Sequence, residues 1–337
     1  MKQENKLLPG SLFCLLIGAA AWVMANYIPT VGKLIGGPVF AILLGMILAF
    51  WKRPSAMDAG ITFCSKKILQ YSIIFIGFGM NIRTVLATGG QSLAVMLCTI
   101  AASLLTAFLM GRVLKVPGNT ATLIGVGTSI CGGSAIAATA PVIEADDREV
   151  AYSISTIFLF NILAVFIFPA LGRVFHMTDT GFGIWAGTAI NDTSSVVAAG
   201  FTFSDAAGEL ATIVKLTRTL MIIPITLALT VHRTWKRKRQ GTAAASNYSI
   251  VKIFPWFVLG FLLTAILNST GWIPSAASSW LNELGKFGIM VAMAGIGLNT
   301  NLKSLVKNGV RPIALGLCCW FVVAVVSLVV QHLLHLV

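Results

Sequence analysis

Nine runs of apolar residues, each close to the roughly 20 residues that an α-helix needs to cross a bilayer, constrain this chain more than any other feature. They cover residues 8–28, 34–51, 62–80, 91–111, 150–172, 206–231, 251–268, 277–298 and 312–335. Only 10% of the 337 residues are charged and 57% are hydrophobic, whereas soluble domains carry about 25% charged residues. We therefore predict an all-α polytopic membrane protein that forms a single transmembrane domain over residues 1–337.

Two further apolar segments, 119–145 and 181–203, are interrupted by small and polar residues, so that neither half is long enough to cross the bilayer alone. If each segment enters and leaves on one side, the protein has nine full spans and two re-entrant segments. If each crosses completely, it has eleven spans. We favour the first arrangement and keep the second as the alternative.

The net charge of +13 is distributed between the apolar runs, as expected for membrane orientation and not for a nucleic-acid-binding face. An N-terminus in the cytoplasm places most Lys and Arg residues on the cytoplasmic side, which predicts a C-terminus outside. The basic segment 232–249 is then a cytoplasmic linker loop. It lies within the second of two sequence halves, 8–172 and 181–337.

Internal repeats indicate how the spans are organised. Gly77-Phe-Gly-Met-Asn81 recurs 218 residues later as Gly295-Ile-Gly-Leu-Asn299, and the charge pattern gives the two copies opposite orientations. Gly127-Thr-Ser-Ile-Cys-Gly-Gly-Ser134 recurs 60 residues later as Gly187-Thr-Ala-Ile-Asn-Asp-Thr-Ser194. Inverted repeats around broken helices are typical of secondary transporters that bind their substrate near the bilayer midplane.

The second repeat contains the candidate substrate-binding residues. Glycines allow the chain to reverse, and Ser134 and Asp192 are suited to cap the half-helices that follow. These half-helices would direct positive dipole ends at the membrane centre, which favours an anion. The alternative is that Gly132 and Gly133 mark a close helix contact. The predicted site comprises Ser129, Cys131, Gly132, Gly133, Ser134, Asn191, Asp192, Thr193 and Ser194, together with Lys215 and Arg218.

Asp192, Lys215 and Arg218 are charges that membrane orientation does not explain. Asp192 is the only acidic residue in the middle of an apolar segment, and such a residue is expected to be functional. It could serve only as an N-cap, or it could bind a coupling proton or Na⁺ together with Asn191. Lys215 and Arg218 would bind an oxyanion; alternatively they form a structural ion pair with Asp192 or Glu209.

Motifs for other chemistry are lacking. The six cysteines contain no CxxC pair and have no His at ligand spacing, so we expect neither a disulfide framework nor a metal site. No nucleotide-binding loop or catalytic motif occurs, and we expect no cofactor and no enzymatic activity.

The segments Gly127–Ile143, Gly187–Gly200, Lys215-Leu-Thr-Arg218 and Gly295–Asn301 resemble the YeiH-type sulfate exporter family over nearly the whole chain. The resemblance implies a bacterial inner-membrane protein whose fold is similar to the superfamily of cation:proton antiporters, bile-acid symporters and anion transporters. Some family members look to carry a His-Glu pair at Asn191-Asp192, so the resemblance does not choose between a proton and Na⁺.

We therefore expect a secondary active transporter of a small inorganic or sulfur-containing anion, coupled to a proton or Na⁺ and embedded in the lipid bilayer. An anion channel built from the same polar tips is one alternative. A membrane-embedded enzyme or sensor is another. A homodimer is compatible with the small residues of the first span.

Overall fold

The computed structural model describes residues 4–27, 36–51, 53–239, 255–300 and 309–336, and within these ranges all regular structure is helical. The helices are α1 (Glu4–Tyr27), α3 (Gly37–Leu48), η1 (Ser55–Met57), α4 (Asp58–Phe63), η2 (Cys64–Ile68), α5 (Leu69–Ile76), η3 (Gly77–Gly79), α6 (Ile82–Val113), α7 (Gly118–Ser129), α8 (Gly133–Ile143), α9 (Asp147–Val174), α10 (Asp179–Ala189), α11 (Thr193–Phe203), α12 (Asp205–Thr219), α13 (Ile222–Arg239), α15 (Trp256–Ser269), α16 (Ser275–Asn299) and α18 (Val310–Leu333).

Seven of the nine predicted spans correspond to helical stretches that are long and apolar enough to cross a membrane. The stretch Ser55–Gly79 is one of them, although it passes through a π-helical turn at η2. The other two predicted spans, 34–51 and 251–268, correspond to α3 and α15, which have only 12 and 14 residues. Residues 34, 35 and 251–254 lie outside the described ranges.

The predicted linker 232–249 differs from the structure at its start. The backbone of α13 continues to Arg239, because the first glycine after the basic run is Gly241. Residues 240–249 lie outside the described ranges.

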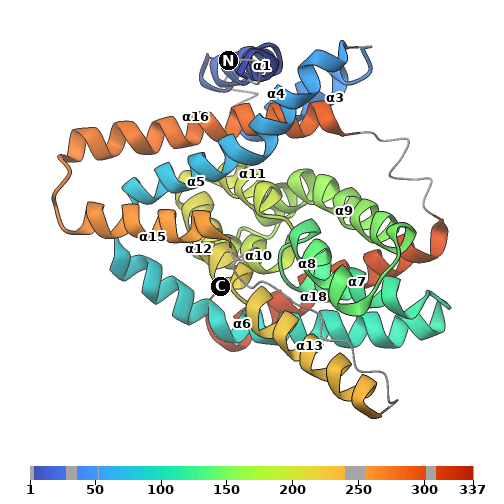
Figure 1. Cartoon of the computed structure of the whole chain (residues 1–337). Helices are drawn as coiled ribbons and strands as arrows, with labels where there is room; N and C mark the ends of the chain where they lie inside the picture. Colours follow the sequence, from blue (N-terminus) through green and yellow to red (C-terminus); the bar gives the residue numbers. More distant parts are fainter. Residues whose placement is uncertain (1–3, 28–35, 52, 240–254, 301–308, 337) are drawn as a thin grey trace.

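The helices form two groups (Figure 1). We call α1, α3, the stretch from η1 to η3, α15 and α16 the panel, and α6 to α13 with α18 the bundle. Figure 1 shows α1, α3, α4 and α16 on one side, α6 and α18 on the opposite side, and α9 to α12 between them. The two sequence halves are interleaved, since α16 packs on α3 and α18 packs on α6.

Close backbone contacts explain the repeated glycines of the panel. A Cβ added at Gly77 would lie 2.6 Å from the Phe261 carbonyl oxygen of α15. A Cβ added at Gly297 would lie 2.3 Å from the Ile42 carbonyl oxygen of α3. The first repeat therefore packs on α15 as the second packs on α3, and this packing relates α5 to α16 and α3 to α15.

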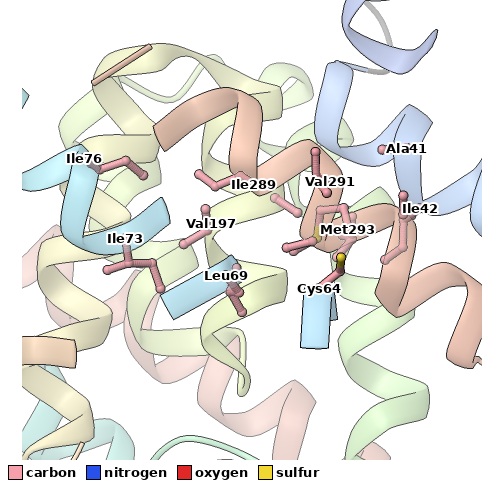
Figure 2. Packing of buried hydrophobic residues seen from close by; sticks show 14 of the residues in the cluster. Ala41, Ile42, Cys64, Leu69, Ile73, Ile76, Val197, Ile289, Val291 and Met293 are labelled. Atoms are coloured by element: carbon pink, nitrogen blue, oxygen red, sulfur yellow. The ribbon is translucent and has the colours of Figure 1, made fainter. Parts of the chain in front are cut away.

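A buried apolar cluster joins the panel to the bundle. It contains Ile42 of α3, Ile73 of α5 and Ile289 of α16, together with Val197 from α11 (Figure 2). The tip-proximal part of α11 is thus in contact with the panel, so any movement of one group along the other would occur at this apolar surface.

Both interrupted segments are re-entrant hairpins, as the first of the two predicted arrangements requires. Asn119 at the start of α7 donates a hydrogen bond to Glu149 at the start of α9, 3.1 Å away, so the α7–α8 hairpin begins and ends on one face. Phe182 of α10 stacks on Phe203 at the end of α11, with ring centroids 4.0 Å apart. Since α9 is long enough to cross the membrane and connects the two hairpins, they enter from opposite faces. We call these the first face and the second face.

Candidate functional site

The site lies where the tips of the two hairpins meet. A Cβ added at Gly132, in the turn of the first hairpin, would lie 3.5 Å from the Cβ of Asp192 in the second. Gly132 has φ +67° and ψ −127°, a conformation that only glycine adopts readily. It provides the chain reversal predicted for the Gly132-Gly133 pair.

The capping predictions hold for one hairpin and fail for the other. Asp192 is the N-cap of α11 and its carboxylate accepts a hydrogen bond from the Ser194 backbone N–H at 3.0 Å. The Ser194 hydroxyl donates to the same oxygen. Ser134, which we expected to cap α8, instead lies in its first turn, because the helix begins one residue earlier at Gly133 with Gly132 in the N-cap position.

Lys215 of α12 is completely buried and binds backbone carbonyls of both hairpins. Its ammonium donates to the carbonyl oxygens of Ile130 and Ile190, at 2.8 and 3.0 Å, and to that of Asn191. Ile130 and Ile190 occupy equivalent positions in the 60-residue repeat. These three bonds use all three N–H groups of the ammonium.

Arg218, one helical turn further along α12, is also fully buried and binds the hairpins in the same paired manner. Its guanidinium donates to the carbonyl oxygens of Thr128 and Ser129, at 2.9 and 2.7 Å, and to that of Thr188. Thr128 and Thr188 are again repeat equivalents. The two cations therefore cap the negative C-terminal ends of α7 and α10.

This capping leaves a positive local charge at the tips. No ion pair of Lys215 or Arg218 with Asp192 or Glu209 is found among the described residues. Two cations and one carboxylate leave a formal charge of about +1, since the opposed dipoles of the four half-helix ends largely cancel. An anion is the ligand that such a centre favours.

A cavity of about 400 Å³ reaches the tips from the first face. We call it the tip cavity; it is lined by Gln70, Cys131, Ser134, Ala137, Ala138, Thr193, Thr219, Ile222, Pro255 and Phe257. Three predicted site residues, Cys131, Ser134 and Thr193, therefore line it directly.

The other predicted residues lie behind the cavity wall. Ser129 donates its hydroxyl to the Val126 carbonyl oxygen, and Gly132 and Gly133 form the turn. Asn191, Asp192, Ser194, Lys215 and Arg218 complete the centre without lining the cavity. Sequence reasoning missed Gln70 as a site residue, although it is the only amide in the run from Leu69 to Met80.

Three buried polar groups near the tips have no hydrogen-bond partner within the described residues. They are the side-chain amide of Asn191, the Nδ2 of Asn161 and the Thr128 hydroxyl. Asn161 of α9 accepts a hydrogen bond from the Asp192 backbone N–H at 3.2 Å, so it bridges α9 to the tip. Groups of three or more His, Cys, Asp or Glu suited to a metal are not found in the part of the chain that the structure describes.

A second cavity of about 400 Å³ opens on the second face. It lies between α3 and α16 of the panel and α11 and the start of α12, and it includes Phe201, Asp205 and Lys286. The repeat relates α3, α16 and α11 to α15, α5 and α8, which line the tip cavity. Corresponding elements thus build both cavities, but only the tip cavity includes residues of the hairpin turns.

Sequence comparison places the chain among known membrane proteins. The family model described as conserved hypothetical protein 698 matches residues 9–316. A UPF0324 membrane protein of Streptococcus mutans is 50% identical over 344 residues, covering 99% of each chain. The chain belongs to the UPF0324 family of membrane proteins. A Fusobacterium nucleatum member is 44% identical over 98% of this chain and 99% of its own, and a Streptococcus pyogenes member is 49% identical over 98% of each. This membership fits the YeiH-type resemblance.

Proposed function

We propose that this UPF0324 protein is a secondary active transporter of a small anion in the bacterial inner membrane, with its N-terminus in the cytoplasm. The observation that carries the proposal is the meeting of two oppositely inserted hairpins at Lys215 and Arg218, with equivalent cavities on the two faces. Inverted repeats of this kind provide two related conformations that alternate access to one site.

The structure would represent the state that is open to the first face. From that face the tip cavity gives access to Ser134 and Thr193, whereas the second cavity ends at Phe201 and Asp205 near the base of the other hairpin. Sliding of the bundle along the apolar panel surface would exchange the two arrangements. The transported anion would leave unchanged, as expected for a carrier and not an enzyme.

The anion would bind to hydroxyl groups at the positive ends of α8 and α11. Thr193 is 9% exposed and lines the cavity, and neither its hydroxyl nor that of Ser134 hydrogen-bonds to a described residue. Lys215 and Arg218 would act through charge and by holding the tips, because Lys215 has no donor left for a ligand.

The coupling ion would bind behind the anion. Asp192 supplies a carboxylate, and the amide of Asn191 has no partner among described residues. Oxygen ligands of this type suit Na⁺, and a carboxylate can also carry a proton. Imposed Na⁺ and proton gradients, tested separately, distinguish these two coupling ions.

Flux into proteoliposomes tests the proposal. Labelled sulfate, sulfite, thiosulfate and propanesulfonate would each be offered under a proton gradient or a Na⁺ gradient. We expect saturable uptake of at least one probe and a reduction of about tenfold in Thr193→Val, because the loss of one hydrogen bond to a charged ligand costs roughly 1.5–3 kcal/mol.

Thr139→Val is the matched control. Thr139 is a buried threonine of α8 whose hydroxyl has no partner in the described protein and does not line the cavity. Its uptake should equal that of the wild type. If no probe shows saturable flux under either gradient, the transporter proposal fails. Currents far above carrier turnover would replace it with a channel.

A further inference from the structure

Gln70 brings an amide from the panel to the site on the bundle. It is the only polar residue among the three panel residues that line the tip cavity, the others being Pro255 and Phe257. It follows directly after the π-helical turn Cys64–Ile68. Such turns rotate the following residues around the helix and are frequent at functional sites.

The Gln70 side chain is uncommitted. It makes no hydrogen bond to any described residue, as is also true of Ser134 and Thr193 on the opposite wall. Three polar side chains from three helices therefore converge on one cavity without satisfying one another. A bound ligand is the natural partner for all three.

The repeat shows that helix packing does not require this amide. The position equivalent to Gln70, 218 residues later, is Gly288 in α16. Gly288 does not line the second cavity, whose polar panel groups include Lys286. Gln70 is thus a departure from the internal symmetry at the place where the panel faces the hairpin tips.

The cavity is larger than a small inorganic anion needs. A water molecule occupies about 30 Å³ of liquid, so about 400 Å³ greatly exceeds the volume of an oxyanion with five heavy atoms. The rest of its wall is apolar and includes Ala137, Ala138, Ile222 and Phe257. This surface would be left wet by a bare oxyanion but would be covered by a short hydrocarbon tail.

We propose that the tip cavity takes an organic anion, with its charged head between Gln70 of the panel and Ser134 and Thr193 of the hairpins and its short apolar tail against Ile222 and Phe257. The proposal rests on the proposed anion transport and specifies its substrate class. Because Gln70 is on the panel and the hydroxyls are on the bundle, the ligand would also hold the two groups together. Gln70 is then a ligand-binding and specificity-determining residue.

Calorimetric binding to the full-length protein in detergent tests this inference, with sulfate, methanesulfonate and propanesulfonate as probes. We expect propanesulfonate to bind at least about tenfold more tightly than sulfate, because each buried methylene contributes roughly 0.8 kcal/mol. Ile222→Ala and Phe257→Ala should reduce this preference several-fold and leave sulfate affinity little changed.

Gln70→Glu examines the head group. The added carboxylate would repel an anion, so all sulfonate affinities should fall by more than tenfold, whereas Gln70→Ala should lose only a few-fold. Tyr71→Phe is the control, since Tyr71 is exposed and does not line the tip cavity.

The outcomes separate this inference from the transport proposal. If sulfate binds as tightly as propanesulfonate, or if Gln70→Glu binds like the wild type, the organic-anion inference is wrong while anion transport stands. If no anion binds and none is transported in proteoliposomes, both fail.

Discussion

At the residue scale, the two buried cations are explained by the backbone that they satisfy. A helix that ends inside a membrane leaves carbonyl groups without partners, and each such group costs several kcal/mol in hydrocarbon. Lys215 and Arg218 bind the last carbonyls of α7 and α10 at equivalent repeat positions. Their first role is therefore to stabilise the two tips.

Replacing Lys215 tests this role. Lys215→Met keeps the length of the side chain but leaves three carbonyl oxygens without a donor, so we expect a loss of about 3–5 kcal/mol of stability. Thermal unfolding in detergent measures the effect. Lys66→Met, at an exposed position, should unfold like the wild type. An unchanged midpoint in Lys215→Met would contradict the capping role.

The two tip glycines provide an internally matched comparison. Gly132→Ala should cost about 1–3 kcal/mol, because φ at Gly132 is +67° and a side chain there is strained even though space is available. Gly133→Ala should be tolerated, since Gly133 is helical and an added Cβ would meet only Phe158 at 3.6 Å. Unfolding midpoints of the two variants should therefore differ, and equal midpoints would argue against strain at the turn.

At the element scale, the hairpins and the panel are joined on the second face by an ion pair. Lys286 of α16 lies 2.9 Å from Asp205 at the start of α12 and 3.0 Å from Glu283 of its own helix. The Asp205 contact connects panel to bundle beside the second cavity. It would have to break before that cavity could extend to the tips.

Asp205→Asn should therefore favour opening toward the second face. Asp205 is largely exposed, so the pair contributes at most about 1 kcal/mol and the expected shift is two- to fivefold. Labelling of Phe201→Cys by an impermeant maleimide reports the opening, with the same protein without this cysteine as background. Glu283→Gln, which removes the partner within α16, should leave labelling unchanged. Equal labelling in both variants would exclude Asp205 as a closing contact.

At the scale of the whole molecule, the inverted insertion of the hairpins determines which surfaces lie on the same face. Lys115 and Arg148 flank the first hairpin, and Thr180 and Ala206 flank the tip of the second, all at exposed positions. An eleven-span chain would separate the members of each pair across the membrane.

Accessibility of single cysteines tests this topology in intact cells. Cysteines at positions 180 and 206 should react with an impermeant maleimide from outside, whereas cysteines at 115 and 148 should react only after permeabilisation. This result would also support the predicted cytoplasmic N-terminus. Opposite behaviour within either pair would restore the crossing arrangement.

Apolar run lengths, the interruptions and the two repeats determined the fold class, the long spans and the positions of the hairpin turns. These features are local, because span length and glycine spacing depend on the bilayer and the backbone. The sequence also identified Asp192, Lys215 and Arg218 as unusual, since charge at depth is costly wherever the chain folds.

Only the tertiary structure decided what those charges contact. Run length alone does not distinguish a hairpin from a broken span, whereas the stacking of Phe182 on Phe203 does. Whether Lys215 faces a ligand or carbonyl groups depends on backbone ends brought together from positions 130 and 190. The site at Gln70 likewise exists only because a panel helix meets hairpin tips far along the chain, and no spacing rule encodes that meeting.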